Sequence, residues 1–128
     1  MLVYASNTPE EFDWAINDRI DEIVEFKLPT STERKRMLIQ YFDEYLQNNN
    51  LTNNVIDKEQ LKSVVAATEG FSGREIHKLV IAWQAAAFGS DLAVLTPSML
   101  QKVLDSHVVQ RKLKENWNAN LISSSIKL

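Results

Sequence analysis

The feature that most constrains the fold is a helical spacing of apolar residues that recurs in four segments between residues 30 and 117. Apolar side chains at positions i, i+3, i+4 and i+7 lie on one face of an α-helix, and such a face packs on a core. The four faces are Leu38, Tyr41, Phe42, Tyr45 and Leu46; Leu61, Val64 and Val65; Ile76, Leu79, Val80, Trp83 and Ala87; and Met99, Leu100, Val103, Leu104 and Val108. The sequence therefore predicts a bundle of four helices.

Start and stop signals bound these helices. In a capping box, the side chain of the N-cap residue and that of a Glu or Gln three residues later satisfy free N–H groups of the first turn. The three such pairs are Thr30 with Glu33, Asp57 with Gln60 and Ser72 with Glu75. Thr96 and Pro97 are a typical start for the fourth helix, while Gly70 and Gly89 end the second and third.

Residues 1–29 have a different pattern. The apolar run Leu2–Ala5 and the run Ile23–Pro29 resemble strands, with a polar turn and a short helical segment between them. A continuous apolar run is typical of a parallel strand covered on both faces, and a parallel pair needs neighbouring strands. We therefore expect a mainly α fold, in which two strands left from a parallel α/β sheet precede a four-helix bundle.

Composition excludes several classes of function. The net charge of −3 and the absence of a basic stripe argue against direct nucleic-acid binding. With no cysteine and two isolated histidines, no metal site is expected. No apolar run approaches the roughly 18 residues of a membrane span, and the start does not resemble a cleavable signal, so we expect a soluble intracellular chain.

The order of motifs resembles the C-terminal part of AAA+ ATPases. The segment Ala5-Ser6-Asn7-Thr8-Pro9 matches the sensor-1 pattern A-x-N-x-P, and Asp18-Arg19-Ile20 matches a GRFD-like turn in which Asp18 replaces glycine and Ile20 replaces phenylalanine. The wording FDWAINDRIDEIVEF, followed by GFSGREI, is most similar to a mitochondrial subgroup of the family. The resemblance divides the chain into the end of the nucleotide-binding core (1–29), a helical lid (30–117) and a flexible tail (118–128).

By this resemblance Asn7 is the sensor-1 residue, which holds the attacking water or a γ-phosphate oxygen, and Arg19 is the arginine finger that serves the neighbouring subunit. A guanidinium suits the second role because its planar fork matches phosphate oxygens. The residues alone leave alternatives open. Asn7 can form an Asx turn before Pro9, and Arg19 can pair with nearby acids such as Asp21.

Arg74 matches the sensor-2 arginine, which contacts nucleotide phosphates of its own subunit. A cation at the second position of a helix opposes the helix dipole, and such a local conflict is expected at a functional site. The alternative is a solvated arginine offset by Glu75. Gly73 and His77 are the other candidate nucleotide contacts; capping and close packing explain Gly73 better than catalysis does, and a partly exposed structural role suits His77 better than contact with an adenine or ribose.

The resemblance implies a ring of identical subunits that binds ATP with Mg²⁺, at the mitochondrial inner membrane with the ATPase facing the matrix. Membrane anchoring would use segments absent from this chain. The chain contains neither G-x-x-x-x-G-K-[ST] nor the acidic strand end that holds magnesium, so it is expected to be inactive alone and to complete a site. The alternative is a nonenzymatic helical interaction module or a truncated product that blocks rings.

Overall fold

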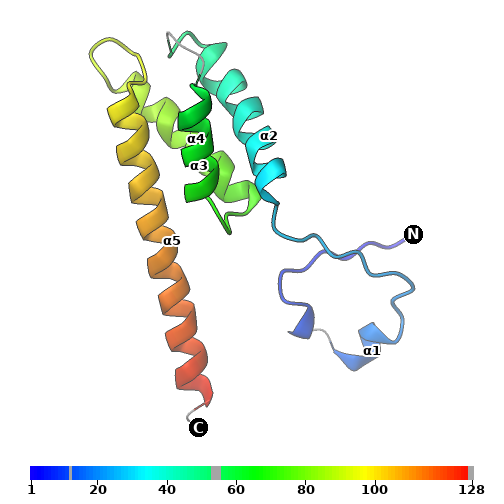
Figure 1. Ribbon diagram of the computed structural model, residues 1–128. Coiled ribbons are helices and arrows are strands. Elements are labelled where there is room, and N and C mark those ends of the chain that lie inside the picture. The colour runs from blue at the N-terminus through cyan, green and yellow to red at the C-terminus, as the bar shows by residue number, and fades with distance from the viewer. Residues whose placement is uncertain (12, 53–55, 127–128) are drawn as a thin grey trace.

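The computed structural model describes residues 1–11, 13–52 and 56–126. A helical bundle follows an extended N-terminal segment that contains only single helical turns (Figure 1). The elements are η1 (Pro9–Glu11), α1 (Trp14–Asn17), α2 (Ser31–Phe42), the π-helical turn η2 (Asp43–Gln47), α3 (Lys58–Ala67), α4 (Gly73–Phe88) and α5 (Pro97–Ile126). The predicted mainly helical fold with four long helices is confirmed.

All three predicted capping boxes are present. At each of them the side chain of the N-cap residue accepts a hydrogen bond from a backbone N–H of the first turn, and the N3 side chain accepts one from the N-cap backbone. At α4, for example, the Ser72 Oγ accepts from Glu75 N at 3.2 Å and Ser72 N donates to the Glu75 carboxylate at 2.9 Å. These side chains fix where α2, α3 and α4 begin.

Helix α4 is the centre of the bundle and packs against both α2 and α5. Its five predicted inward residues, from Ile76 to Ala87, are all buried. Trp83 is fully buried, and its indole N–H donates a hydrogen bond to the Leu100 carbonyl of α5 at 3.1 Å. The predicted stripes of α2, α3 and α5 each supply buried residues to the same core, including Leu38, Val64 and Leu104.

Arg34 of α2 is buried, which is uncommon for a charged side chain. Its guanidinium donates to the Pro29 carbonyl and to the Val65 carbonyl, each at 3.1 Å. Val65 belongs to the last turn of α3, where carbonyl groups lack helical partners and the helix dipole favours a cation. Arg34 therefore caps α3 from a neighbouring helix, a role that only the tertiary fold reveals.

The two expected strands are not present in the described residues, so this part of the prediction was wrong for this structure. Leu2–Ala5 and most residues from Ile23 to Leu28 are exposed and form no ladder. The physical reason is the one that the sequence indicates: an isolated parallel pair has no neighbouring strands and no covering helix. Neither η1 nor α1 packs against any helix of the bundle.

Helix α5 is longer than expected. It continues to Ile126, whereas the sequence predicts a frayed tail after Trp117. Residues 118–126 contain neither Gly nor Pro, so nothing in them breaks a helix, even though their apolar residues have no helical spacing. The second half of α5 extends away from the bundle (Figure 1) and exposes Leu113, Trp117 and Leu121.

Candidate functional site

Asn7 and Arg19 lie apart from the bundle, on the N-terminal segment. Asn7 is exposed in a bend, where Thr8 N donates to the Ser6 hydroxyl. Arg19 is exposed in the turn after α1, and its backbone N–H donates to the Ile16 carbonyl at 3.0 Å. Within the described residues no ion pair joins Arg19 to the acids around it. The guanidinium is thus accessible to a charge supplied from outside.

Arg74 is the second residue of α4 and is exposed. Among the described residues it makes no ion pair, and Glu75, the predicted local partner, is engaged elsewhere. The first N–H groups of a helix and the positive end of its dipole favour an anion. Arg74 adds a full positive charge beside that end. Its exposed guanidinium can therefore donate hydrogen bonds to an anion at the start of α4.

The Glu75 carboxylate pairs with Arg111 of α5, a contact that the sequence prediction missed. The Arg111 Nε lies 3.7 Å from Glu75, and its Nη2 lies 2.9 Å from Glu115. The guanidinium also stands over the Phe71 ring, 5.5 Å from its centroid. Glu115 is one helical turn after Arg111, so that pair could be found from the sequence. Glu75 and Phe71 come from another element, and no local signal indicates them.

Gly73 is a packing position. A Cβ built on it would lie 2.8 Å from Cε of Met37, so the end of the Met37 side chain of α2 packs against this glycine. The His77 ring packs on Tyr41 of α2, with 5.0 Å between the ring centroids, and its Nε2 lies 3.0 Å from the hydroxyl of Tyr45 in η2. These contacts are those of a partly exposed structural histidine, and they hold His77 one turn along α4 from Arg74.

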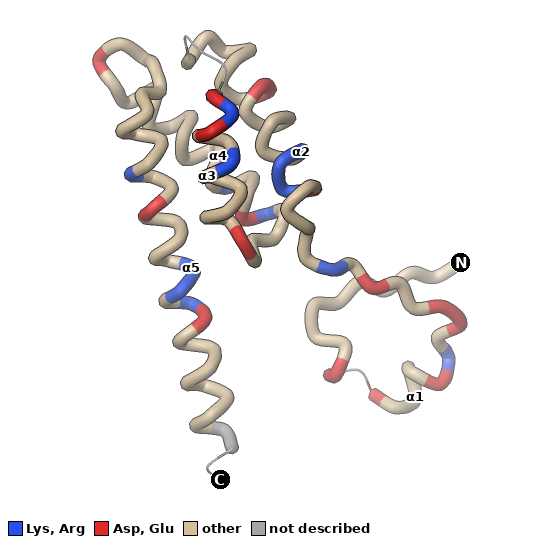
Figure 2. The backbone as a smooth tube through the Cα atoms, in the orientation of Figure 1, with Lys and Arg blue, Asp and Glu red and all other residues tan. Residues whose placement is uncertain are grey.

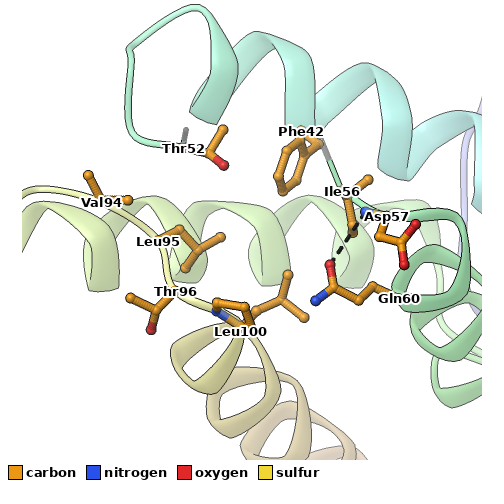
Figure 3. A pocket seen from close by; sticks show the side chains of 10 residues that line it. Phe42, Thr52, Ile56, Asp57, Gln60, Val94, Leu95, Thr96 and Leu100 are labelled. Atoms are coloured by element: carbon orange, nitrogen blue, oxygen red, sulfur yellow. Dashed lines mark hydrogen bonds between the residues drawn. The ribbon is translucent and has the colours of Figure 1, made fainter. Parts of the chain in front are cut away.

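One cavity, about 600 Å³, lies at the end of the bundle where α5 begins (Figure 3). Its lining includes Phe42, Ile56, Gln60, Leu95 and Leu100. A second, about 130 Å³, lies between α4 and α5. None of the five predicted site residues lines either cavity. The candidate nucleotide contacts are therefore surface groups and do not form an enclosed pocket within the described residues.

Two further properties bear on function. In the part of the chain that the structure describes, no three His, Asp or Glu side chains are grouped so that they could hold a metal ion. None of the described helices combines the length and the apolar character needed to cross a bilayer. The described residues therefore do not form a Mg²⁺ ligand set.

A helical bundle with an anion-attracting helix start is compatible with the lid of an AAA+ ATPase, and the relatives of this chain are AAA domain-containing proteins of an ATPase family. In particular, the chain is 44% identical over 91% of its length to "ATPase family AAA domain-containing protein 3" of Bos taurus. It is 44% identical to "ATPase family AAA domain-containing protein 3A" of Homo sapiens and 46% identical to the Drosophila melanogaster homolog, again over 91% of the chain.

These matches confirm the similarity that the motif order predicts. The chain spans about a fifth of the length of these relatives, 21% for the cattle and human proteins and 20% for the fly protein. No family model matches the chain, and no solved structure matches it significantly. The similarity therefore covers one stretch of each of these longer relatives.

Proposed function

We propose that this chain is the C-terminal part of an AAA+ ATPase and supplies three phosphate-directed residues to an ATP site that other segments complete. The observation that carries the proposal is the identity of 44% to AAA domain-containing proteins over 91% of the chain. The four-helix bundle and the exposed cation at the start of α4 support it. In this proposal residues 1–29 end the nucleotide-binding core and residues 30–117 form the lid.

Within the lid, Arg74 is the contact to nucleotide phosphates of the same subunit. Its guanidinium is unpaired within the described residues and stands beside the positive end of a 16-residue helix. Gly73 allows close approach of the α4 backbone, and His77, one turn further on, would contact the ribose or base. Because these groups bind phosphate without a metal ligand set, ATP and Mg²⁺ would be held mainly by the segment that carries the P-loop.

Asn7 and Arg19 act in the core part of the proposed site. Asn7 would position the attacking water, while Arg19 would reach the nucleotide of a neighbouring copy and offset charge on the transferred phosphoryl group. The exposure of both side chains supports this, since neither is used by the bundle. The proposed assembly is a ring of identical subunits, at the mitochondrial inner membrane with the ATPase facing the matrix.

The test is ATP hydrolysis by the purified chain, alone and mixed with a protein that carries the P-loop half. We expect no turnover alone, turnover in the mixture, and a loss of about a hundredfold to a thousandfold with Arg74→Ala, the range for removing one charge-stabilising donor. Arg36→Ala is the matched control, because Arg36 is an exposed helical arginine away from the start of α4. An active mixture that is indifferent to Arg74→Ala would contradict the role of Arg74.

A second candidate is a nonenzymatic interaction module or a ring-blocking product, and the second half of α5 favours it. Val109, Leu113, Trp117 and Leu121 recur every four residues and are 52–68% exposed. A row of exposed apolar side chains along one side of a helix is suited to packing against a partner protein. In that case the mixture shows no turnover, and the chain added to an intact parent protein lowers its ATPase rate.

A further inference from the structure

The smaller cavity lies beside the core, between the first half of α4 and the middle of α5. It has a volume of about 130 Å³. One water needs roughly 10–15 Å³ by this kind of measure, so the cavity has room for an ion of several atoms. Its lining is Phe71, Glu75, Lys78, His107, Gln110, Arg111 and Lys114. Apart from Phe71, every one of these residues is polar or charged.

The charges around this cavity are mostly positive, in a chain whose net charge is −3. Lys78, Arg111 and Lys114 contribute three positive charges to the lining, and Glu75 contributes one negative charge. Glu115, paired with Arg111, stands nearby. Figure 2 shows most of the basic residues of α5 gathered about halfway along the helix, with one nearer its start.

His107 reports the same excess of positive charge. Burial lowers its pKa, and the positive charges of Lys114 and Lys78 lower it further. The charges of two lysines, one on α4 and one on α5, therefore lower the pKa of the same imidazole ring. Neither lysine forms an ion pair within the described residues, so no carboxylate is paired with them to cancel their field.

Arg111 supplies a donor that its protein contacts leave unused. Its side chain is only 20% exposed, and its Nη1 is buried without a hydrogen-bond partner among the described residues. The other nitrogens are directed to Glu75 and Glu115. A buried N–H group without an acceptor is unfavourable, and more so when it is charged.

We propose that this cavity is a binding site for a phosphoryl group, held between Lys78 of α4 and Arg111 and Lys114 of α5. A tetrahedral oxyanion offers acceptors in several directions, which suits donors that converge from two helices, and guanidinium–phosphate hydrogen bonds are among the strong ones. The site differs from the proposed Arg74 contact, because Arg74 does not line the cavity. The phosphoryl group could come from a free phosphate or nucleotide, or from a phospholipid headgroup.

The test is the NMR titration of the two histidines, with inorganic phosphate compared with sodium chloride at equal ionic strength. An anion in the cavity would stabilise the protonated His107 ring, so phosphate is expected to raise its pKa by roughly one, the lower end of the effect of an opposite charge within about 4–6 Å. His77 reports separately on the proposed Arg74 contact, since it lies one turn from Arg74, packs on Tyr41 and Tyr45 and does not line the cavity. The variant His77→Gln assigns the signals.

Two lysine variants make the test specific. Lys114→Ala removes a lining cation and is expected to abolish the phosphate effect on His107. Lys112→Ala is the matched control, because Lys112 is an exposed lysine of the same helix that does not line the cavity. The proposal is overturned if phosphate leaves the pKa of His107 unchanged, if Lys114→Ala and Lys112→Ala respond alike, or if His77 alone responds.

The two sources are separated with ATP and with phosphatidylcholine vesicles that contain phosphatidic acid. A change at His107 with ATP and none with the vesicles identifies a soluble phosphate, and the reverse identifies a headgroup; either result depends on Lys114 if the proposal is correct. The readout here is the pKa of His107 and not ATP turnover. The cavity proposal can therefore fail while the role of Arg74 holds, and the role of Arg74 can fail while the cavity binds phosphate.

Discussion

At the scale of single residues, the contacts of the Glu75 carboxylate determine which charged side chains near the start of α4 are paired. It accepts the backbone N–H of Ser72 at 2.9 Å and lies 3.7 Å from the Arg111 Nε. Its neighbour in sequence, Arg74, consequently keeps no partner among the described residues. A solvated arginine beside a helix start contributes little to folding stability, which is why we propose a binding role for Arg74.

The pH dependence of stability is expected to show the burial of His107. Its pKa in the folded chain is lowered by burial and by Lys114 and Lys78, while an unfolded histidine titrates near pH 6.5. Between these two values the unfolded chain binds a proton that the folded chain does not, so the free energy of unfolding decreases as the pH falls. Above about pH 6.5 the residue makes no pH-dependent contribution.

Urea unfolding of the chain and of His107→Gln between pH 7.5 and 5 measures this effect. The histidine chain is expected to lose more stability than the variant below about pH 6.5, and their difference should be constant above it. The difference between the two chains cancels groups such as Glu33, whose pKa is lowered by the hydrogen bonds from Thr30. If the free energies of unfolding of the two chains followed parallel curves across the whole pH range, the lowered pKa of His107 would be contradicted.

At the scale of elements, the connection from α3 to α4 depends on a glycine with a left-handed backbone. Gly70 has φ of +79°, and a Cβ there would also lie 3.2 Å from the Arg111 Nη2. Gly70→Ala is expected to lower the free energy of unfolding by about 1–2 kcal/mol, the cost of a side chain in the left-handed region. Chemical denaturation measures the loss.

Gly89→Ala is the matched control. Gly89 caps α4 with φ of −76°, which any residue adopts, and a Cβ there would meet the Ala85 carbonyl oxygen at 3.4 Å, an ordinary contact. Alanine also restricts the unfolded chain, so this variant is expected to equal the parent or exceed its stability by about 0.4–1 kcal/mol. If both variants lost the same stability, the left-handed turn would not be the cause.

The same elements show what the sequence could predict. Caps and apolar stripes are local signals, and they located α2, α3 and α4 and the buried face of α4 from Ile76 to Ala87. Strand formation is not local, because a ladder needs a partner, so Leu2–Ala5 could not be settled by its own pattern. The buried role of Arg34 and the Arg111–Glu75 contact were likewise beyond prediction, since each joins separate helices.

The candidate site was predictable to a lesser degree than the fold. The sequence indicated that Arg74 stands at the second position of a capped helix, and the structure has it there. It could not indicate which cation Glu75 would select, or that His77 would pack between Tyr41 and Tyr45. Those choices depend on how α2, α4 and α5 lie against one another.

At the scale of the whole molecule, the chain consists of a bundle with one core and a segment without one. Among the described residues, every buried one lies between Arg34 and Leu104, and the elements before α2 contact none of the helices. Within the described residues, the hydrogen bond that crosses the junction is that from Arg34 to the Pro29 carbonyl. Folding stability should therefore reside in residues from Pro29 onward.

Deletion of residues 1–28 tests this division. Since the deleted part buries almost nothing against the bundle, the free energy of unfolding is expected to change by less than about 0.5 kcal/mol, the usual range for surface changes. The denaturant m-value should also stay close to that of the full chain, because it follows the surface that unfolding exposes. Thr30→Ala in the shortened chain is the positive control; it removes the cap of α2 and is expected to cost about 1 kcal/mol. A deletion that costs more than this control would mean that the N-terminal segment supports the bundle, and the exposed Asn7 and Arg19 would then belong to the same folding unit as Arg74.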